Sequence, residues 1–196
     1  MNYSNINIKL SDLAEIFTGL NYQRKEISQK SHGINFIQAK DIANNQLFKN
    51  TTFKIEKISI DKRFILNNND ILFSAKGNRN FAFLYKEQYG ESTASSTFFI
   101  IRITINSILP EYLSWYLNQK PVQDYIKSQS VGTYTPSINK VQLSELEIPV
   151  PSIELQKKII RIDSFRRKEK ELLNTISNKK DFLIENILYK KIKESY

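Results

Sequence analysis

The chain has 196 residues, a formal charge of +9 and a hydrophobic fraction of 40%, which is enough apolar material for one core. It contains no cysteine and a single histidine, His32, so disulfides, thiolate metal sites and cysteine nucleophiles are excluded, and a His-based metal cluster or catalytic triad is not expected. Met1–Leu10 lacks the apolar run of a signal peptide, and no stretch approaches the length of a membrane span; we therefore expect a cytoplasmic protein with no membrane partner.

The positive surplus indicates a polyanionic partner, most often nucleic acid. Residues 1–152 hold 17 Lys and Arg against 13 Asp and Glu, and residues 153–196 hold 12 against 7. Both parts are therefore basic, and the second is more basic per residue. The alternative is an ordinary solvated basic surface with no polyanion bound to it.

Runs of apolar residues predict an α+β body over residues 1–151. The first run, Ile8–Phe17, is expected to be a strand end that continues into a short helix, capped by Ser11 or Asp12 and ended by Gly19. Thr97–Ile105 contains successive apolar residues, as in a strand buried on both faces. Further strands are expected at 34–39, 53–60, 71–74, 81–85 and 146–150, helices at 110–118 and 122–128, and a helical or extended segment at 138–143.

The last quarter of the chain predicts one long helix. Pro149 and Pro151 bar a helix before them, and neither Pro nor Gly follows Pro151. Ser152 can cap the first turn. About 40 helical residues would reach roughly 60 Å, far more than a domain of this size needs to cover its own core. Apolar residues recur along one coiled-coil-like stripe, for which we predict a dimer interface. They are Ile159, Ile162, Phe165, Leu172, Ile176, Leu183 and Ile187.

Two polar loops carry residues suited to DNA. Lys76–Asn80 combines a glycine with Lys, Arg and Asn, which bind phosphates and base edges. Gly132–Lys140 concentrates hydroxyls, a tyrosine, an asparagine and a lysine. A third segment, Gly90–Ser96, could offer hydroxyl and N–H donors to phosphates. The alternative for Lys76–Asn80 is an ordinary turn. For Gly132–Lys140 it is a capped helix start, and for Gly90–Ser96 a plain loop.

Catalysis by this chain is not expected. Asp41 and Asp70 follow apolar runs and could be mistaken for acid catalysts, but each precedes an isoleucine in a pattern typical of turns. Metal-dependent nucleases need several carboxylates that converge, and the sequence shows no such spacing. We predict no metal site and no cofactor.

In order along the chain, several segments resemble the specificity subunit of type I restriction-modification systems. Each segment is weakly informative alone; their order, spacing and the long helix after them are more specific. Leu155 stands where that family often has Glu. The matching segments are Ile37–Ile42, Asn69–Gly77, Ser92–Ser96, Pro110–Leu113, Gly132–Ile138 and Leu146–Ile159.

The resemblance implies a target-recognition domain at residues 1–151 and a dimerisation or spacer helix at 152–196. Family members usually carry two such units with antiparallel helices, whereas this chain has one. It therefore implies a half-length subunit that homodimerises, or pairs with another half subunit, and a two-fold homodimer would read a bipartite palindromic DNA site. Adenine methyltransferase subunits, with S-adenosylmethionine, would methylate the DNA, and a restriction subunit with nuclease and translocase activity would cleave it.

Within this hypothesis, phosphate contacts and base contacts fall to different residues. The phosphate-binding candidates are Arg24, Lys40, Lys76, Arg79 and Lys140. The base-reading candidates are Asn78, Arg79, Asn80, Thr133 and Tyr134. The alternative functions are a non-catalytic protein- or RNA-binding module with an oligomerising helix, and a stand-alone enzyme such as a nuclease.

Overall fold

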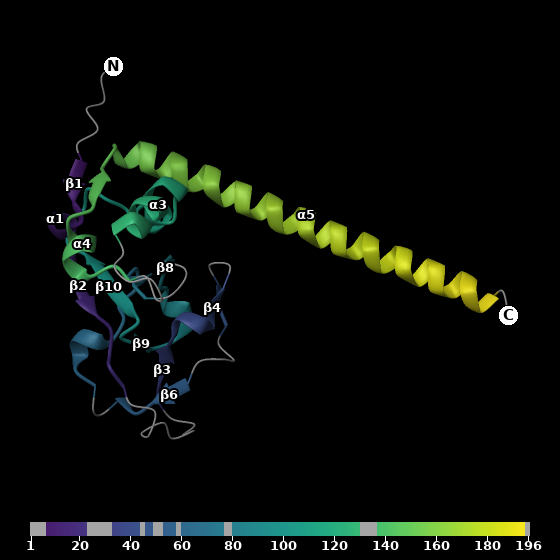
Figure 1. The fold of residues 1–196 in the computed structure, drawn as a ribbon, viewed down its shortest axis with the longest axis horizontal. Helices are drawn as coiled ribbons and strands as arrows, with labels where there is room; N and C mark the ends of the chain where they lie inside the picture. Colours follow the sequence, from purple (N-terminus) through teal and green to yellow (C-terminus); the bar gives the residue numbers. More distant parts are fainter. Residues whose placement is uncertain are drawn as a thin grey trace, which may run out of the picture. The chain divides into compact units, whose positions relative to one another are not determined.

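The computed structural model describes residues 7–22, 33–43, 46–48, 53–57, 60–76, 80–129 and 137–194. Its contacts divide the chain into two units, Met1–Gln156 and Lys157–Tyr196. The first unit is a mixed α/β body and the second continues one long helix (Figure 1). This confirms the predicted α+β fold class with a long C-terminal helix.

An antiparallel sheet of four strands, in the order β2-β10-β7-β8, forms the centre of the body. Its register pairs Phe99 of β10 with Thr18 of β2 on one side and with Phe73 of β7 on the other. Phe98 and Ile100 are fully buried, as the continuous apolar run predicted. The strands are β2 (Ala14–Thr18), β7 (Ile71–Ser74), β8 (Ala82–Leu84) and β10 (Phe98–Ile103).

The helix predicted within Ile8–Phe17 is much shorter than expected. The chain begins with strand β1 (Asn7–Lys9) and one helical turn, α1 (Leu10–Leu13), and then enters β2. Lys9 precedes α1 without a side-chain cap, so the predicted cap by Ser11 or Asp12 was wrong. Within β2, Ala14 and Ile16 are buried and Glu15 is exposed; pairing with β10 imposes this two-residue alternation on residues that could also form a helix.

A second sheet has the order β6-β3-β9, with β3 (Ile34–Ile37) antiparallel to β6 (Phe53–Ile55) and parallel to β9 (Ser92–Ala94). The strand β9 corrects the loop expected at Gly90–Ser96. Ser92 and Thr93 are fully buried, and the Ser92 hydroxyl donates to the Gly90 carbonyl at 2.6 Å. These two hydroxyls therefore face the core and do not offer donors to a phosphate.

Short elements complete the first unit. The closing strand β11 (Glu147–Pro149) pairs with β1, as residues 7–9 meet 147–149 in antiparallel register. The ambiguous segment 138–143 forms a helical turn. The other elements are β4 (Ile42–Ala43), β5 (Gln46–Leu47), α2 (Pro110–Leu117), α3 (Lys120–Gln129), α4 (Lys140–Ser144) and the 3₁₀ turns η2 (Ala39–Asp41), η5 (Lys62–Phe64) and η6 (Glu87–Tyr89).

The core of the first unit lies between these layers. One cluster joins Ile37 of β3, Leu72 of β7 and Phe98 of β10, and a smaller one joins Ile34, Phe36 and Ile55. Burial of these apolar side chains stabilises the packing of the strands. The packed strands in turn hold the surface loops that connect them.

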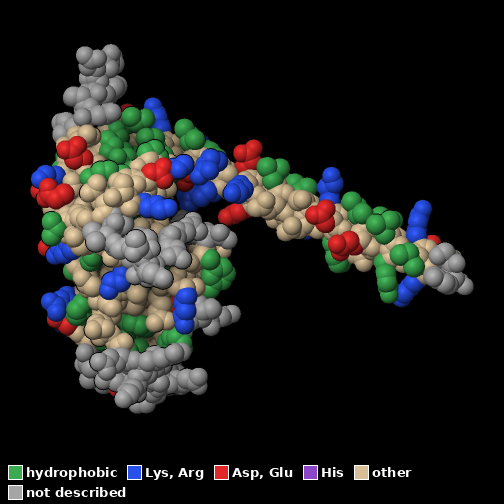
Figure 2. All heavy atoms as spheres, viewed as in Figure 1, with side chains coloured by type: hydrophobic (Ala, Val, Ile, Leu, Met, Phe, Trp, Pro, Cys, Tyr) green, Lys and Arg blue, Asp and Glu red, His purple; other side chains and the backbone are tan. Residues whose placement is uncertain are grey.

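The helix α5 (Ile153–Glu194) spans 42 residues, about 63 Å at the α-helical rise. As predicted, Ser152 caps its first turn, with the Leu155 N–H donating to the Ser152 hydroxyl at 3.3 Å. Apolar side chains recur along the helix (Figure 2). Among the helices that the structure describes, none combines the length and apolarity needed to cross a bilayer.

Candidate nucleic-acid interface

The two loops predicted to contact DNA begin or end next to each other. Lys76 and Ser137 form an antiparallel β-bridge, and the Ile138 N–H donates to the Ala75 carbonyl at 3.2 Å. The Ala75 N–H in turn donates to the Thr97 carbonyl at 3.1 Å. The end of β7, the residue before β10 and the approach to α4 therefore meet at one place.

A basic cleft opens beside this junction. Its volume is about 630 Å³, and its lining includes two cations, Arg63 and Lys76, together with polar side chains. Both cations are exposed. The lining residues are Phe17, Thr18, Gly19, Asn21, Arg63, Phe64, Lys76 and Ser96. Two cations with amide and hydroxyl groups suit a phosphate of a polyanion.

Arg63 was not predicted from the sequence, although it follows Asp61 and Lys62 in a visibly charged run. Its Nε lies 3.3 Å from Asp61 Oδ2, and its guanidinium lies 4.6 Å from the ring centroid of Phe64. Asp61 also accepts the Arg63 N–H at 3.0 Å. The Arg63–Asp61 ion pair is exposed to solvent on both sides, so it contributes little to stability and leaves the guanidinium accessible to a ligand.

Part of the cleft lining, at Gly19 and Ser96, is close-packed backbone. Gly19 donates its N–H to the Phe98 carbonyl at 3.0 Å, and a Cβ at Gly19 would lie 2.3 Å from the Ser95 carbonyl oxygen. The Leu20 N–H donates to Ala94 and the Ser96 N–H to Leu20. The glycine is required because the chain after β2 approaches the chain after β9 this closely.

A partly buried ion pair lies next to Phe17 of the cleft lining. Arg102 donates from Nε to Asp70 Oδ1 at 2.9 Å and from Nη2 to Oδ2 at 2.7 Å. This hydrogen bond raises the pKa of Arg102 above its ordinary value. The guanidinium also lies 5.1 Å from the ring centroid of Phe17, which lines the cleft. The pair therefore fixes the turn at Asp70 and one wall of the cleft together.

Both candidate acids serve turns, as predicted. Asp41 accepts the Gln38 N–H at 2.9 Å, and Asp70 accepts the Asn67 N–H at 2.8 Å in addition to Arg102. Both are buried. Over the described ranges, no group of three or more His, Cys, Asp or Glu side chains gathers where it could hold a metal ion.

The predicted site residues are distributed as follows. Lys76 lines the cleft, and Lys140 is exposed at the start of α4, three residues after the Ser137 bridge. Lys40 lies apart from the cleft lining, with its ammonium 4.6 Å from the ring centroid of Phe53. Asn80 donates its amide to the Ser74 carbonyl at 2.8 Å and so closes its own loop. Arg24, Asn78, Arg79, Thr133 and Tyr134 lie outside the described residues.

The predicted interface residues of α5 carry large exposed apolar surfaces. Ile159 is partly buried. The exposed fractions of the others are 67% for Ile162, 60% for Phe165, 54% for Leu172, 55% for Ile176, 60% for Leu183 and 50% for Ile187. A stripe of this size on one helix is typical of a surface that another chain covers.

The described features are therefore a cleft lined by two cations and a helix with an exposed apolar stripe. The sequence comparisons name the family. The chain belongs to the type I restriction modification DNA specificity domain family, whose model matches residues 5–179.

Two curated relatives are specificity subunits from Methanocaldococcus jannaschii. The chain is 31% identical over 110 residues to the type I restriction enzyme MjaVIII specificity subunit, covering 56% of this chain and 24% of that protein. It is 32% identical over 79 residues to the MjaIX specificity subunit, covering 37% of this chain and 18% of that protein. The chain thus matches about a quarter or less of each relative's length.

Solved structures share the fold. The HsdS subunit from Thermoanaerobacter tengcongensis has a TM-score of 0.63 at 17% identity, covering 85% of this chain and 38% of that one. The type I restriction-modification S subunit from M. genitalium has a TM-score of 0.60 at 16% identity, covering 89% and 42%. The fold class and the resemblance to specificity subunits, both predicted from the sequence, are confirmed.

Proposed function

We propose that this chain is the DNA-recognition element of a type I restriction-modification system and binds duplex DNA at the basic cleft. The observation that carries the proposal is the Lys76–Ser137 bridge, which joins the bases of the two predicted recognition loops beside Arg63. The relatives, which are named specificity subunits, support the same role.

Within this proposal the cations position the DNA and the loops read it. Lys76, Arg63 and Lys140 neutralise phosphates near the junction, and Lys40 and Arg24 extend the contact along the backbone. Asn78, Arg79, Asn80, Thr133 and Tyr134 contact base edges. Phosphate contacts supply affinity without sequence information, whereas base contacts supply the specificity.

The helix α5 gives the proposed complex two-fold symmetry. Its exposed stripe pairs with the same stripe of a second copy in antiparallel orientation, which buries apolar surface that one chain leaves in water. Two identical domains related by a two-fold axis then read an interrupted palindrome. Under this proposal residues 1–151 are the target-recognition domain and 152–196 the dimerisation helix.

Catalysis belongs to other subunits in this proposal. Adenine methyltransferase subunits bind S-adenosylmethionine and modify the site that this chain selects, and a restriction subunit cleaves DNA. The complex acts on DNA in the cytoplasm. This chain contributes no catalytic group.

A duplex-DNA titration over a salt series tests the proposal. Affinity should fall steeply with salt because phosphate contacts release counterions. The titration is repeated with the partner methyltransferase subunit bound, since its contacts can add to a weak intrinsic affinity. Equal binding to duplex RNA, or salt-independent binding in both series, would favour the rival function of a protein- or RNA-binding module.

A further inference from the structure

A buried glutamine joins the first turn of α5 to the rest of the first unit. Gln156 is fully buried, and its side-chain amide makes three hydrogen bonds. Oε1 accepts the Leu109 N–H at 2.8 Å, and Nε2 donates to the Ser107 carbonyl at 2.9 Å and to the Pro151 carbonyl at 2.8 Å. The amide therefore uses its acceptor and its donors where water cannot replace the partners.

Gln156 also completes the start of another helix, α2. Leu109 is the N-cap residue of α2, and its side chain makes no capping hydrogen bond. In a capping box, a Glu or Gln at the third helical position accepts the N–H of the N-cap residue. In α2 that position is Tyr112, which cannot fill this role. Gln156, 47 residues after Leu109, supplies the acceptor instead.

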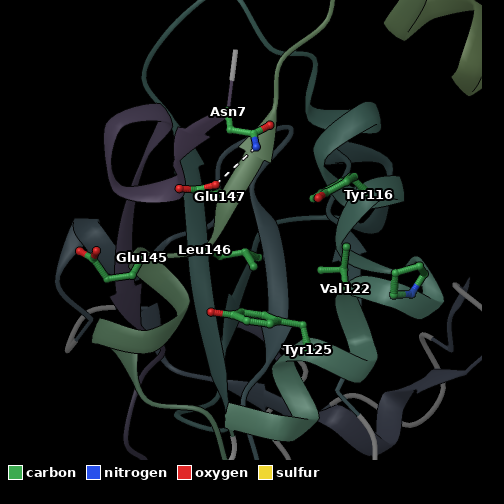
Figure 3. Close-up of a pocket in the computed structure, with 8 residues that line it drawn as sticks. Asn7, Tyr116, Val122, Tyr125, Glu145, Leu146 and Glu147 are labelled. Atoms are coloured by element: carbon green, nitrogen blue, oxygen red, sulfur yellow. Dashed lines mark hydrogen bonds between the residues drawn. The ribbon is translucent and has the colours of Figure 1, made fainter. Parts of the chain in front are cut away.

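Tyr112 returns a hydrogen bond from α2 to the segment that leads into α5. Its hydroxyl donates to the Pro149 carbonyl at 3.0 Å, and Pro149 ends β11 four residues before the start of α5. One turn further along α2, Tyr116 lines a cleft of about 410 Å³, with Glu147 of β11 on its other side (Figure 3). Because α2 and β11 are not closely packed there, the hydrogen bonds of Gln156 and Tyr112 are direct ties between the starts of the two helices.

A single strand connects these ties to the proposed DNA site. Ser107 and Leu109 lie between β10 and α2. At the other end of β10, the Thr97 carbonyl accepts the Ala75 N–H at 3.1 Å, next to Lys76 of the basic cleft. The first turn of α5 belongs to the first unit, and the helix continues from it without a break over 42 residues. Strand β10 therefore links the start of α5 to the junction of the two predicted recognition loops.

We infer that Gln156 is a positioning residue for DNA recognition, which holds the first turn of α5 in one place on the recognition domain and so limits the spacer lengths that the dimer accepts. The inference rests on the proposed function. One extra base pair moves the second half-site by about 3.4 Å and rotates it by about 35°. A dimer whose helix starts are held in place must deform such DNA to reach both half-sites. Gln156 contacts no DNA and acts through the helix start.

Gln156→Met tests this inference in the full-length chain, because methionine fills a similar volume and offers no N–H donor. Fluorescence anisotropy measures binding to the inverted repeat that wild type selects, with its own spacer and with one base pair added or removed, with and without the methyltransferase partner. Wild type should bind its own spacer at least about tenfold more tightly than either neighbour. In Gln156→Met this ratio should fall toward one, while the affinity for the best duplex changes little.

Asn118→Leu is the matched control. Asn118 also makes three side-chain hydrogen bonds, but at the opposite end of α2. Its Oδ1 accepts the Ala82 N–H at 3.0 Å, and its Nδ2 donates to the Ala82 carbonyl at 2.7 Å and to the Ser114 carbonyl at 2.8 Å. The control loses the same number of hydrogen bonds away from α5, so it should lower the melting temperature and keep the wild-type spacer ratio.

The outcomes separate this inference from a purely structural role and from the proposed function. Weaker binding of Gln156→Met to all three duplexes at an unchanged ratio would overturn the inference, as would an equal loss of spacer preference in Asn118→Leu. If Gln156→Met does not fold, Tyr112→Phe tests the same junction, since it removes only the hydrogen bond to Pro149; a wild-type ratio there would overturn the inference. A wild-type chain without spacer preference would overturn the inference and the dimer together, and one that binds no duplex would overturn the proposed function as well.

Discussion

Replacing Lys76 with alanine tests the DNA interface and the dimer in one experiment. Each phosphate contact to duplex DNA contributes about 0.9 to the slope of log affinity against log salt. A homodimer on one duplex presents Lys76 twice, so Lys76→Ala should reduce the magnitude of the slope by about 1.8. Between 50 and 200 mM salt, the affinity ratio of wild type to variant should shrink about twelvefold for a dimer and about threefold for a monomer.

The assay is a fluorescence-anisotropy titration of one labelled duplex at five salt concentrations. Arg63→Ala should behave like Lys76→Ala, because both cations line the same cleft. Lys120→Ala is the control; Lys120 is exposed on α3 and pairs with Asp124 at 2.7 Å, away from the basic cleft. A Lys76→Ala slope equal to that of wild type and of the control would refute the assignment of this cleft to phosphate binding.

Three further predictions concern the stability of the first unit. Asp70→Asn should lower the free energy of unfolding in urea by about 3 kcal/mol, because it removes the charge that pairs with a largely buried Arg102; an unchanged transition midpoint would contradict this. Gly19→Ala should destabilise by about 1–3 kcal/mol, since the Cβ would lie 2.3 Å from the Ser95 carbonyl oxygen, and a thermal melt at the wild-type temperature would count against the packing described. Burial raises the pKa of Tyr112 to about 12. The unfolded tyrosine therefore loses its proton first, and stability falls as pH rises from about 10 toward 12. In Tyr112→Phe, the free energy of unfolding measured by urea titration over that pH range should lack the fall that ionisation of Tyr112 causes.

The long helix could be predicted because local sequence decides it. Pro149 and Pro151 fix where a helix can begin, Ser152 caps it, and nothing after them interrupts it. The central strands β7 and β10 were predictable for a similar reason, since their apolar runs are too short for helices and are bounded by polar residues. These features depend on neighbours within a few positions.

The errors occurred where distant parts of the chain decide the structure. Ala14–Thr18 becomes a strand because β10 lies beside it, and Ser92–Ala94 becomes one because β3 offers a parallel edge. Small polar residues such as Ser92 give no local signal of burial. Tertiary pairing overrides local preference at such positions.

The sequence identified the segments that contribute to the candidate site, but not which of their residues lie close together in the fold. Lys76 and the segment around Ser137 were selected for their residue types, whereas their bridge depends on the fold. Arg63 gained significance only when the fold placed it in the lining of the same cleft as Lys76. The bidentate Asp70–Arg102 pair likewise joins a turn to a strand far along the chain, which a single sequence does not reveal.

Selection of duplexes from a random pool, by the purified chain alone and with its methyltransferase partner, tests the central claim most directly. Two identical recognition domains joined through α5 should enrich an inverted repeat with a spacer of fixed length. Enrichment of a single uninterrupted site, of an asymmetric sequence by the homodimer, or of no sequence under both conditions would contradict the account.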